Sequence, residues 1–240
     1  MQLSEGLEIL LSSVGNKPLE LWSKTISLDG KIKRINDENL NNNKVIEIIG
    51  KTDTSTNKDS ISTCISCPAL STDFLQTNLP IIVFVIKNLK LDGKIEFQVI
   101  DHMNLRRKFI LITNSTREKI PKILPTMSYF PFNLEEGWNH LEIDLRLLTK
   151  DIYSTNYTTL NRIIVYPNFR IRRIYLQDRH YEKYEKPQDF FKALIELSDL
   201  RKNHIKLIDK NCQTNTQKTT TIVPKIIKKK RVKKKIEVTK

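Results

Sequence analysis

Glycine and long apolar segments are both scarce in this sequence. Only 6 of its 240 residues are glycine, and neither a P-loop nor a G-x-G-x-x-G pattern occurs, which argues against a glycine-rich phosphate-binding loop. The longest uninterrupted apolar run extends from Ile81 to Ile86. That run is far shorter than the roughly 20 residues that cross a bilayer as a helix. We therefore expect neither a nucleotide-binding loop nor a membrane protein.

Cysteine is also rare, and the three present are Cys64, Cys67 and Cys212. They are too few for a disulfide framework, and an odd number suits a reducing compartment. Cys64 and Cys67 have C-x-x-C spacing, but a structural zinc ion takes four ligands, and the histidines are scattered singly. A redox motif would accompany a βαβ pattern, which is missing. We interpret the pair as two cysteines at a strand end and expect no metal and no cofactor.

No set of catalytic residues is recognisable. The adjacent carboxylates Asp37-Glu38 and Glu135-Glu136 are neighbours on turns, and such neighbours seldom face one site as an acid/base pair must. We interpret both pairs as solvated turns. No serine or cysteine has the surroundings of a nucleophile elbow. We therefore expect that the protein is not an enzyme.

The sequence has a large excess of positive charge, with 41 Lys and Arg against 27 Asp and Glu, for a net charge of +14. A chain this basic is suited to bind a polyanion, which can be nucleic acid, an anionic membrane or an acidic protein surface such as that of tubulin. The first 15 residues contain two glutamates and no lysine or arginine, unlike a secretory signal peptide. We therefore expect a soluble intracellular protein.

The densest basic segment lies near the C-terminus. Between Lys225 and Lys240 there are nine Lys and Arg and one Glu. The candidate partner-binding residues in this run are Lys228, Lys229, Lys230, Arg231, Lys233, Lys234 and Lys235. A nuclear import signal, a nucleic-acid-binding patch and an electrostatic tether to an acidic polymer all fit such a run, and composition does not choose among them.

Alternation of apolar and polar residues dominates the middle of the sequence. Ile95, Phe97 and Val99 alternate with polar residues, a turn follows at 101–104, and a second strand at 108–113 completes a hairpin. Further strands are predicted at 45–49, 81–86, 141–145, 160–166 and 171–176. Many short strands joined by polar turns predict an all-β fold, a single β-sandwich or jelly-roll-like domain with short peripheral helices.

Two helices are predicted outside this β-rich region. Apolar residues recur at helical spacing from Leu3 to Val14, just before Gly15, and Pro187 is placed to open a late helix. The apolar pattern thins after residue 203. We therefore expect one domain over 1–203 and a basic tail over 204–240 with little or no fold of its own.

Two further basic clusters lie inside the β-rich segments and supply the other candidate partner-binding residues, which are Arg106, Arg107, Lys108, Arg170, Arg172 and Arg173. A solvated strand face and a contact face for an acidic partner both fit them. Two clusters in one small domain favour the contact face, since arginine pairs bidentately with carboxylates. We expect the interleaved aromatic residues, such as Phe169 and Tyr175, to pack in the core.

Several segments are similar to a known family. They are SVGNKPLELW at 13–22, GKIKRI at 30–35, NLRRKF at 104–109, EGWN at 136–139 and RIRRIY at 170–175. In this order they resemble the cilia- and flagella-associated protein 20 family over about residues 10 to 191. Glu136 stands where the family pattern has aspartate.

The resemblance implies a β-sandwich shaped like a carbohydrate-binding module. It also implies a structural role at the inner junction of ciliary doublet microtubules, where the family helps join the B-tubule to the A-tubule beside the parkin co-regulated protein. The expected partners are tubulin and an inner-junction protein similar to the parkin co-regulated protein. The expected location is the cytoskeleton of the cilium or flagellum, with the basal body as a further site.

A nuclear protein that binds nucleic acid through the lysine-rich tail is the alternative. Neither function needs a membrane. The resemblance does not assign the basic clusters to tubulin, so their place on a contact face is predicted from residue type alone.

Overall fold

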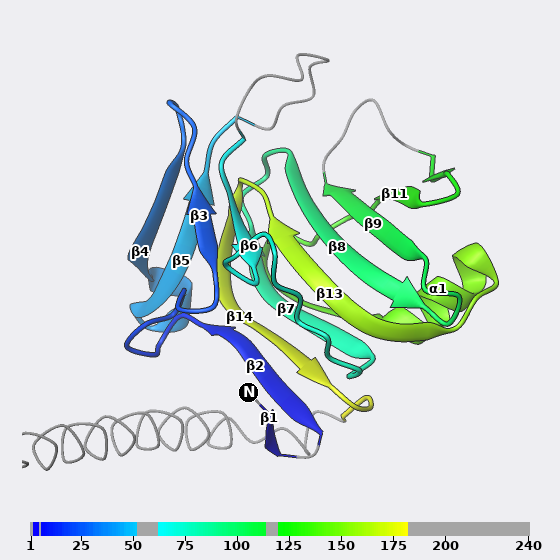
Figure 1. Cartoon of the computed structure of the whole chain (residues 1–240). Coiled ribbons are helices and arrows are strands. Elements are labelled where there is room, and N and C mark those ends of the chain that lie inside the picture. Colours follow the sequence, from blue (N-terminus) through cyan, green and yellow to red (C-terminus); the bar gives the residue numbers. More distant parts are fainter. Residues whose placement is uncertain (1, 5, 52–61, 114–119, 182–240) are drawn as a thin grey trace, which may run out of the picture. The chain divides into compact units, whose positions relative to one another are not determined.

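The computed structural model describes residues 2–4, 6–51, 62–113 and 120–181 (Figure 1). Its strands form two sheets. Sheet A contains β1 (Gln2–Ser4), β2 (Leu7–Ser12), β4 (Lys31–Asp37), β5 (Asn43–Ile49), β7 (Ile81–Asn88), β12 (Gly137–Asp144) and β14 (Phe169–Gln177). Sheet B contains β3 (Ser23–Thr25), β6 (Cys64–Cys67), β8 (Gly93–Asp101), β9 (Arg106–Thr113), β10 (Lys122–Ile123), β11 (Met127–Pro131) and β13 (Tyr157–Val165).

The strand β14 lies at the centre of sheet A. One side of it pairs with β7, which pairs in turn with β12. Its other side pairs with β5 in its first half and with β2 in its second half. The edge strand β4 continues the sheet beyond β5. In sheet B the order is β10-β11-β9-β8-β13-β6-β3, and β3 is the edge strand. The edge strands β3 and β4 of the two sheets lie on the same side of the sandwich (Figure 1).

One apolar cluster fills the space between the sheets. Ile82, Phe84 and Ile86 of β7 face it, and the rings of Phe97 and Phe109 stack within it at 5.4 Å. Each such side chain stabilises the fold by about 1.5–3 kcal/mol relative to exposure. The all-β sandwich predicted from alternation is confirmed, and so are the strands predicted at 45–49 and 81–86 and the hairpin formed by β8 and β9.

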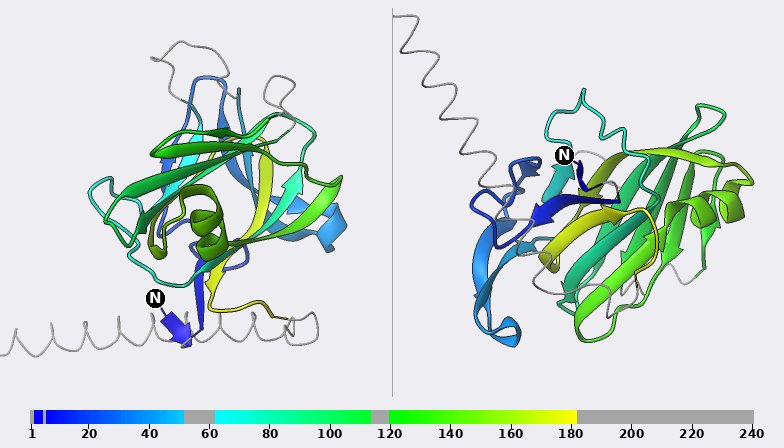
Figure 2. Two further views of the ribbon diagram at one scale, coloured as in Figure 1. Left: turned by 90° about the vertical axis from the view of Figure 1, so that its right-hand side faces the viewer. Right: turned by 90° about the horizontal axis from the view of Figure 1, so that it is seen from below.

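One short α-helix, α1 (Leu145–Tyr153), covers an end of the sandwich (Figure 2). The helix contacts β7 and β12 of sheet A and β13 of sheet B, so it closes the core on that side. A single 3₁₀ turn, η1 (Glu38–Leu40), follows β4. Within the described part of the chain, no helix combines the length and apolar character needed to cross a membrane.

The N-terminal helix predicted between Leu3 and Val14 is wrong, because this segment forms β1 and β2. Leu10 and Leu11 both join the core, since a register shift in the pairing of β2 with β14 makes Leu10 an extra residue. Leu7 packs on the opposite face of sheet A, beside Tyr175. Apolar residues on both faces and a bulge give β2 a spacing that imitates a helix. The late helix at Pro187 and the tail at 204–240 lie outside the described residues.

Candidate partner-binding site

The first basic cluster divides between the two faces of sheet B, because successive residues of β9 point to opposite sides. Arg107 faces inward and is 8% exposed, while Arg106 is exposed on the outer face. Lys108 also faces outward, where its Nζ lies 2.8 Å from Oε1 of Glu96. The guanidinium of Arg106 lies 5.0 Å above the ring of Phe74. Of the three predicted residues, Arg106 offers the most accessible cation.

Arg107 is a structural residue. Its Nε donates to Oδ2 of Asp101 at 2.9 Å, its Nη1 donates to the carbonyl of Pro125, and its guanidinium lies 4.5 Å above the ring of Tyr153 in α1. Asp101 also accepts hydrogen bonds from the backbone N–H groups of Met103 and Leu105. Arg107 thereby ties the β8–β9 turn to α1, and its guanidinium is not available to a partner.

In the second cluster, on β14, a similar internal network holds Arg170. Its Nη1 lies 2.8 Å from Oδ2 of Asp37, and its Nε lies 2.8 Å from Oε1 of Glu47. Because both carboxylates belong to β4 and β5, this guanidinium fastens the edge hairpin to the centre of sheet A. The main role of Arg170 is therefore structural, and a contact with a partner would be secondary.

Asp37 is the centre of this network, and the prediction of a solvated turn at Asp37-Glu38 is wrong for its first residue. The side chain of Asp37 is fully buried, and Glu38 is exposed. Besides Arg170, Asp37 accepts from Nζ of Lys87 at 3.0 Å and from Nε1 of Trp138 at 3.3 Å. Burial alone raises the pKa of Asp37, but the hydrogen bonds from these three side chains outweigh it and hold the pKa below its usual range.

Arg172 and Arg173 both face away from the core. The pairing of β14 with β7 shifts register between Ile171 and Arg173, and Ile171 and Ile174 on either side both belong to the core. Nη1 of Arg172 donates to the carbonyl of Lys44 at 3.0 Å. Burial lowers the pKa of Arg172, which means that its charged form is incompletely solvated. A carboxylate supplied by a partner would stabilise that charge.

The two cysteines of β6 lie on opposite faces of their strand. Cys67 is fully buried in the core, whereas Cys64 is half-buried on the other face beside Ser66. They therefore do not converge on one metal ion. Burial raises the pKa of the Cys67 thiol to about 12, so this sulfur is protonated at neutral pH.

The lysine run predicted as a partner-binding segment, Lys228, Lys229, Lys230, Arg231, Lys233, Lys234 and Lys235, lies outside the described residues.

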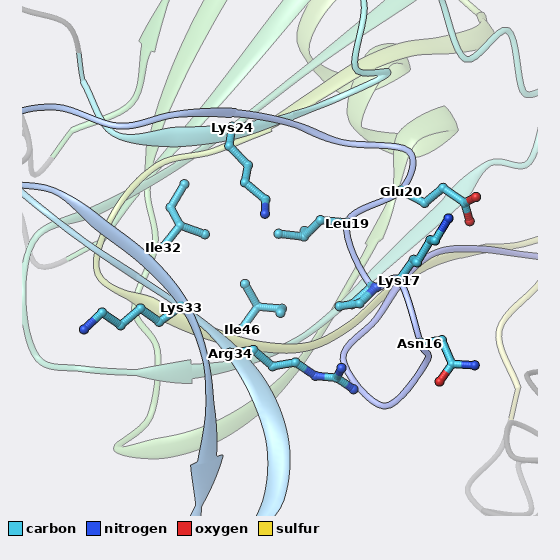
Figure 3. A pocket seen from close by; sticks show the side chains of 10 residues that line it. Asn16, Lys17, Leu19, Glu20, Lys24, Ile32, Lys33, Arg34 and Ile46 are labelled. Atoms are coloured by element: carbon cyan, nitrogen blue, oxygen red, sulfur yellow. The ribbon is translucent and has the colours of Figure 1, made fainter.

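A basic pocket that the sequence did not reveal lies beside the edge strands β3 and β4. Its volume is about 450 Å³, and its wall contains four cations, which are Lys17, Lys24, Lys33 and Arg34. Figure 3 shows Lys24 and Leu19 pointing toward each other, with Ile32 beside Lys24 and Ile46 below them. These cations do not form a run in sequence, so composition gave no signal. Only the pairing of β4 with β5 and the loop before β3 bring them together.

Comparisons with known proteins agree with the resemblance seen in the sequence. A family profile described as the CFA20 domain matches residues 1–194. The chain is 38% identical over 185 residues to cilia- and flagella-associated protein 20 of Chlamydomonas reinhardtii, covering 77% of this chain and 91% of that protein. The protein of the same name from Paramecium tetraurelia is 39% identical with the same coverage.

Among solved structures, a family 11 carbohydrate-binding module from Clostridium thermocellum, in complex with a β-1,3-1,4-mixed-linked tetrasaccharide, matches with a TM-score of 0.37 and 11% identity. The match covers 75% of this chain and 99% of that module, and it carries no conclusion about ligands. The family profile and the sequence relatives are sufficient by themselves to assign the family. This chain belongs to the CFA20-domain family, the family of the cilia- and flagella-associated proteins 20.

Proposed function

We propose that this chain is a non-enzymatic structural protein of the axoneme that binds microtubules and helps close the inner junction between the A- and B-tubules of ciliary doublets. The observation that carries the proposal is the identity of 38–39% to proteins named cilia- and flagella-associated protein 20 over most of their length. Tubulin is the principal partner, and an inner-junction protein similar to the parkin co-regulated protein is the second.

The internal contacts of the domain support a mechanical role as a rigid connector. Both sheets share one core, and ion pairs fasten the peripheral parts to it: Arg170 holds the β4–β5 hairpin through Asp37, and Arg107 holds the β8–β9 turn through Asp101. A domain with such internal ties keeps a fixed spacing between two attached surfaces. The outward cations of Arg106 and Arg172 are available to carboxylates of tubulin.

Co-pelleting with microtubules tests the proposal. The full chain is compared with a chain that ends at Val223, each at low and at moderate salt, because generic polycation binding weakens steeply with ionic strength. We expect the shorter chain to pellet with microtubules at moderate salt. The double variant Arg106→Glu and Arg172→Glu should weaken binding several-fold, whereas Lys51→Glu, which alters an exposed cation paired with Asp29, should not.

Loss of all binding when the tail is removed would contradict the proposal. The lysine run would then act as a generic polycation, and the nuclear, nucleic-acid-binding alternative would take precedence. That alternative predicts affinity for DNA or RNA that depends on residues 225–240 and decreases steeply with salt.

A further inference from the structure

The pocket beside β3 and β4 has walls from four separate parts of the chain. The loop from Asn16 to Glu20 forms one wall, Lys24 of β3 lies opposite, β4 contributes Ile32 to Arg34, and Ile46 of β5 lies at the base. The strands β3 and β4 that contribute to it lie on the side of the sandwich away from α1 (Figure 1). A volume of about 450 Å³ lies within the range of ligand sites, about 300–1,000 Å³.

The connection from β3 to β4 fixes the width of this opening. Between the two strands the chain turns beside Thr63, whose Oγ1 accepts from the backbone N–H of Ser27 at 3.0 Å. Gly30 lies so close to Thr63 that an added Cβ would meet Oγ1 at 1.7 Å. Trp22, which is buried and donates to the carbonyl of Leu10 at 2.8 Å, anchors the end of the loop on the other wall. The pocket is therefore preformed by packed segments.

The residues around the pocket carry an excess of positive charge. Four cations line it against a single carboxylate, that of Glu20. In Figure 3, Lys24 points into the opening, Lys33 points away from it, and Lys17 and Glu20 extend toward the same side. Among the residues that the structure describes, Lys17, Lys24 and Lys33 take part in no ion pair. Because the cations outnumber the one carboxylate, the pocket would attract an anion that enters it.

The pocket also has an aliphatic part. Leu19 lies on the loop wall, Ile32 lies on the β4 wall, and Ile46, which is only 2% exposed, lies at the base. The lining contains no aromatic ring on which a base could stack, and no helix begins there to hold a phosphate. A ligand that satisfies both parts of the pocket carries an aliphatic group for the base and carboxylates for the rim.

The strands on the two sides of the pocket, β3 and β4, are edge strands, and this indicates that the ligand is extended. The outer edges of β3 and β4 have no neighbouring strand within the described part of the chain, so their backbone groups can pair with an extended peptide. Lysines on edge strands often serve only to prevent aggregation. Lys24 differs from such a residue because it points across the pocket toward Leu19 (Figure 3).

We propose that this pocket binds an extended acidic peptide segment of a partner protein, with one aliphatic side chain of the peptide on Leu19, Ile32 and Ile46 and its carboxylates beside Lys24, Lys17 and Arg34. The inference assigns a peptide-binding site to the fold. It does not require that the outer faces of the sheets bind microtubules, so it goes beyond the proposed function.

Fluorescence anisotropy of the full chain with a labelled peptide tests the proposal. The probe is a glutamate-rich peptide that contains a single leucine, and the second probe has serine in place of that leucine. We expect Lys24→Glu to weaken binding of the first peptide about tenfold or more, since it replaces an attraction by a repulsion. The peptide without leucine should bind the unsubstituted chain about tenfold more weakly. This is the factor in affinity expected for one partly buried aliphatic side chain.

The matched control is Lys51→Glu, which makes the same change of charge at an exposed lysine outside the pocket. It should alter affinity less than twofold. Equal weakening by both substitutions, or by neither, would overturn the proposal, because binding would then follow net charge or the lysine run. A short oligonucleotide that competes equally well and is equally sensitive to Lys24→Glu would also overturn it, by showing a general anion site.

Lys17→Glu is the second variant, in case Lys24→Glu disturbs the edge strand β3. It lies in the loop wall, and we expect it to weaken peptide binding several-fold with an unchanged far-ultraviolet circular dichroism spectrum. Co-pelleting of the Lys24→Glu chain with microtubules separates the two proposals. Normal pelleting with lost peptide binding supports a peptide site that is separate from the microtubule contact. Lost pelleting with normal peptide binding would overturn the pocket proposal and would place Lys24 in the microtubule contact.

Discussion

Arg106 and Arg107 are neighbours in sequence, but β9 directs their side chains to opposite faces of sheet B. Arg107→Ala would leave Asp101 buried without its ion-pair partner and remove the contact with Tyr153. We expect this substitution to lower the free energy of unfolding by about 3–5 kcal/mol. Arg106→Ala removes an exposed contact with Phe74 and should cost less than about 1 kcal/mol. Urea unfolding followed by circular dichroism measures both, and similar losses would contradict the assignment of Arg107 to structure.

The buried carboxylates predict how stability depends on pH. The pKa values of Asp37 and Asp101 both lie below the ordinary value of 3.8: burial raises each, and the hydrogen bonds that each carboxylate accepts outweigh the burial. A carboxyl group with a lowered pKa in the folded state stabilises the fold at pH values above its unfolded pKa. That contribution is lost as the pH falls through the folded pKa. We expect the free energy of unfolding to decrease as the pH drops below about 4.

Asp37→Asn tests this dependence. The variant should be less stable at neutral pH, because Arg170 and Lys87 lose their buried counterion, and its stability should decline less on acidification. Glu136→Gln is the control, since Glu136 forms an exposed ion pair with Lys90 and should change stability by less than about 1 kcal/mol. Urea unfolding between neutral pH and about pH 3 measures the difference. An unchanged acid dependence in Asp37→Asn would show that another group governs it.

At the scale of elements, strands with clean alternation or with an uninterrupted β-branched run, such as β7, could be predicted, and the bulged strand β2 could not. In β8, Ile95, Phe97 and Val99 alternate with polar residues, so period two is visible in its sequence. The strand β2 has apolar residues on both faces because its outer face packs against Val83 and Tyr175. The sequence of β2 therefore lacks the alternation that identifies a strand, and tertiary pairing decides its conformation.

The helix α1 escaped prediction for a different reason. It is short, and it follows β12 without a loop, since Asp144 both ends the strand and caps the helix. The carboxylate of Asp144 accepts from the backbone N–H of Arg146 at 2.8 Å and of Leu147 at 3.2 Å. An aspartate that ends an alternating stretch fits a turn equally well, so sequence alone does not reveal this double role.

The cap predicts the effect of substitutions at this junction. Asp144→Ala should destabilise the fold by about 1 kcal/mol, and Asp144→Ser should restore most of that loss, because serine also caps helix N-termini well. Asp151→Ala, at an exposed position of the same helix, should have little effect. Thermal unfolding of the three variants gives the comparison. A loss in Asp144→Ser as large as that in Asp144→Ala would show that the ion pair of Asp144 with Arg146, and not the cap, stabilises the junction.

At the scale of the whole molecule, the candidate sites depend on contacts between distant parts of the sequence. Arg170 and Asp37 are 133 positions apart, and the pocket cations come from a loop and two strands of different sheets. For the partner-binding residues of the strands, the signal in the sequence was runs of basic residues. These runs selected Arg106 and Arg172, which the structure places on outer faces, together with the internal Arg107. The separated residues Lys17, Lys24 and Arg34 gave no such signal, because topology alone places them around one opening.

The proposed role at a junction of two filaments requires a fold that does not open between its sheets. The shared core predicts that both sheets unfold together. Trp22 packs between the sheets, and Trp138 of β12 donates from Nε1 to Asp37 at the outer side of sheet A. Two chains, one with Trp22→Phe and one with Trp138→Phe, each retain a single tryptophan. In each chain we expect the fluorescence transition in urea to coincide with the circular dichroism transition, as for a two-state domain. An earlier fluorescence transition from Trp138 would show that sheet A opens at its β12 edge before the core unfolds, and such a domain could not hold two attached surfaces at a fixed distance.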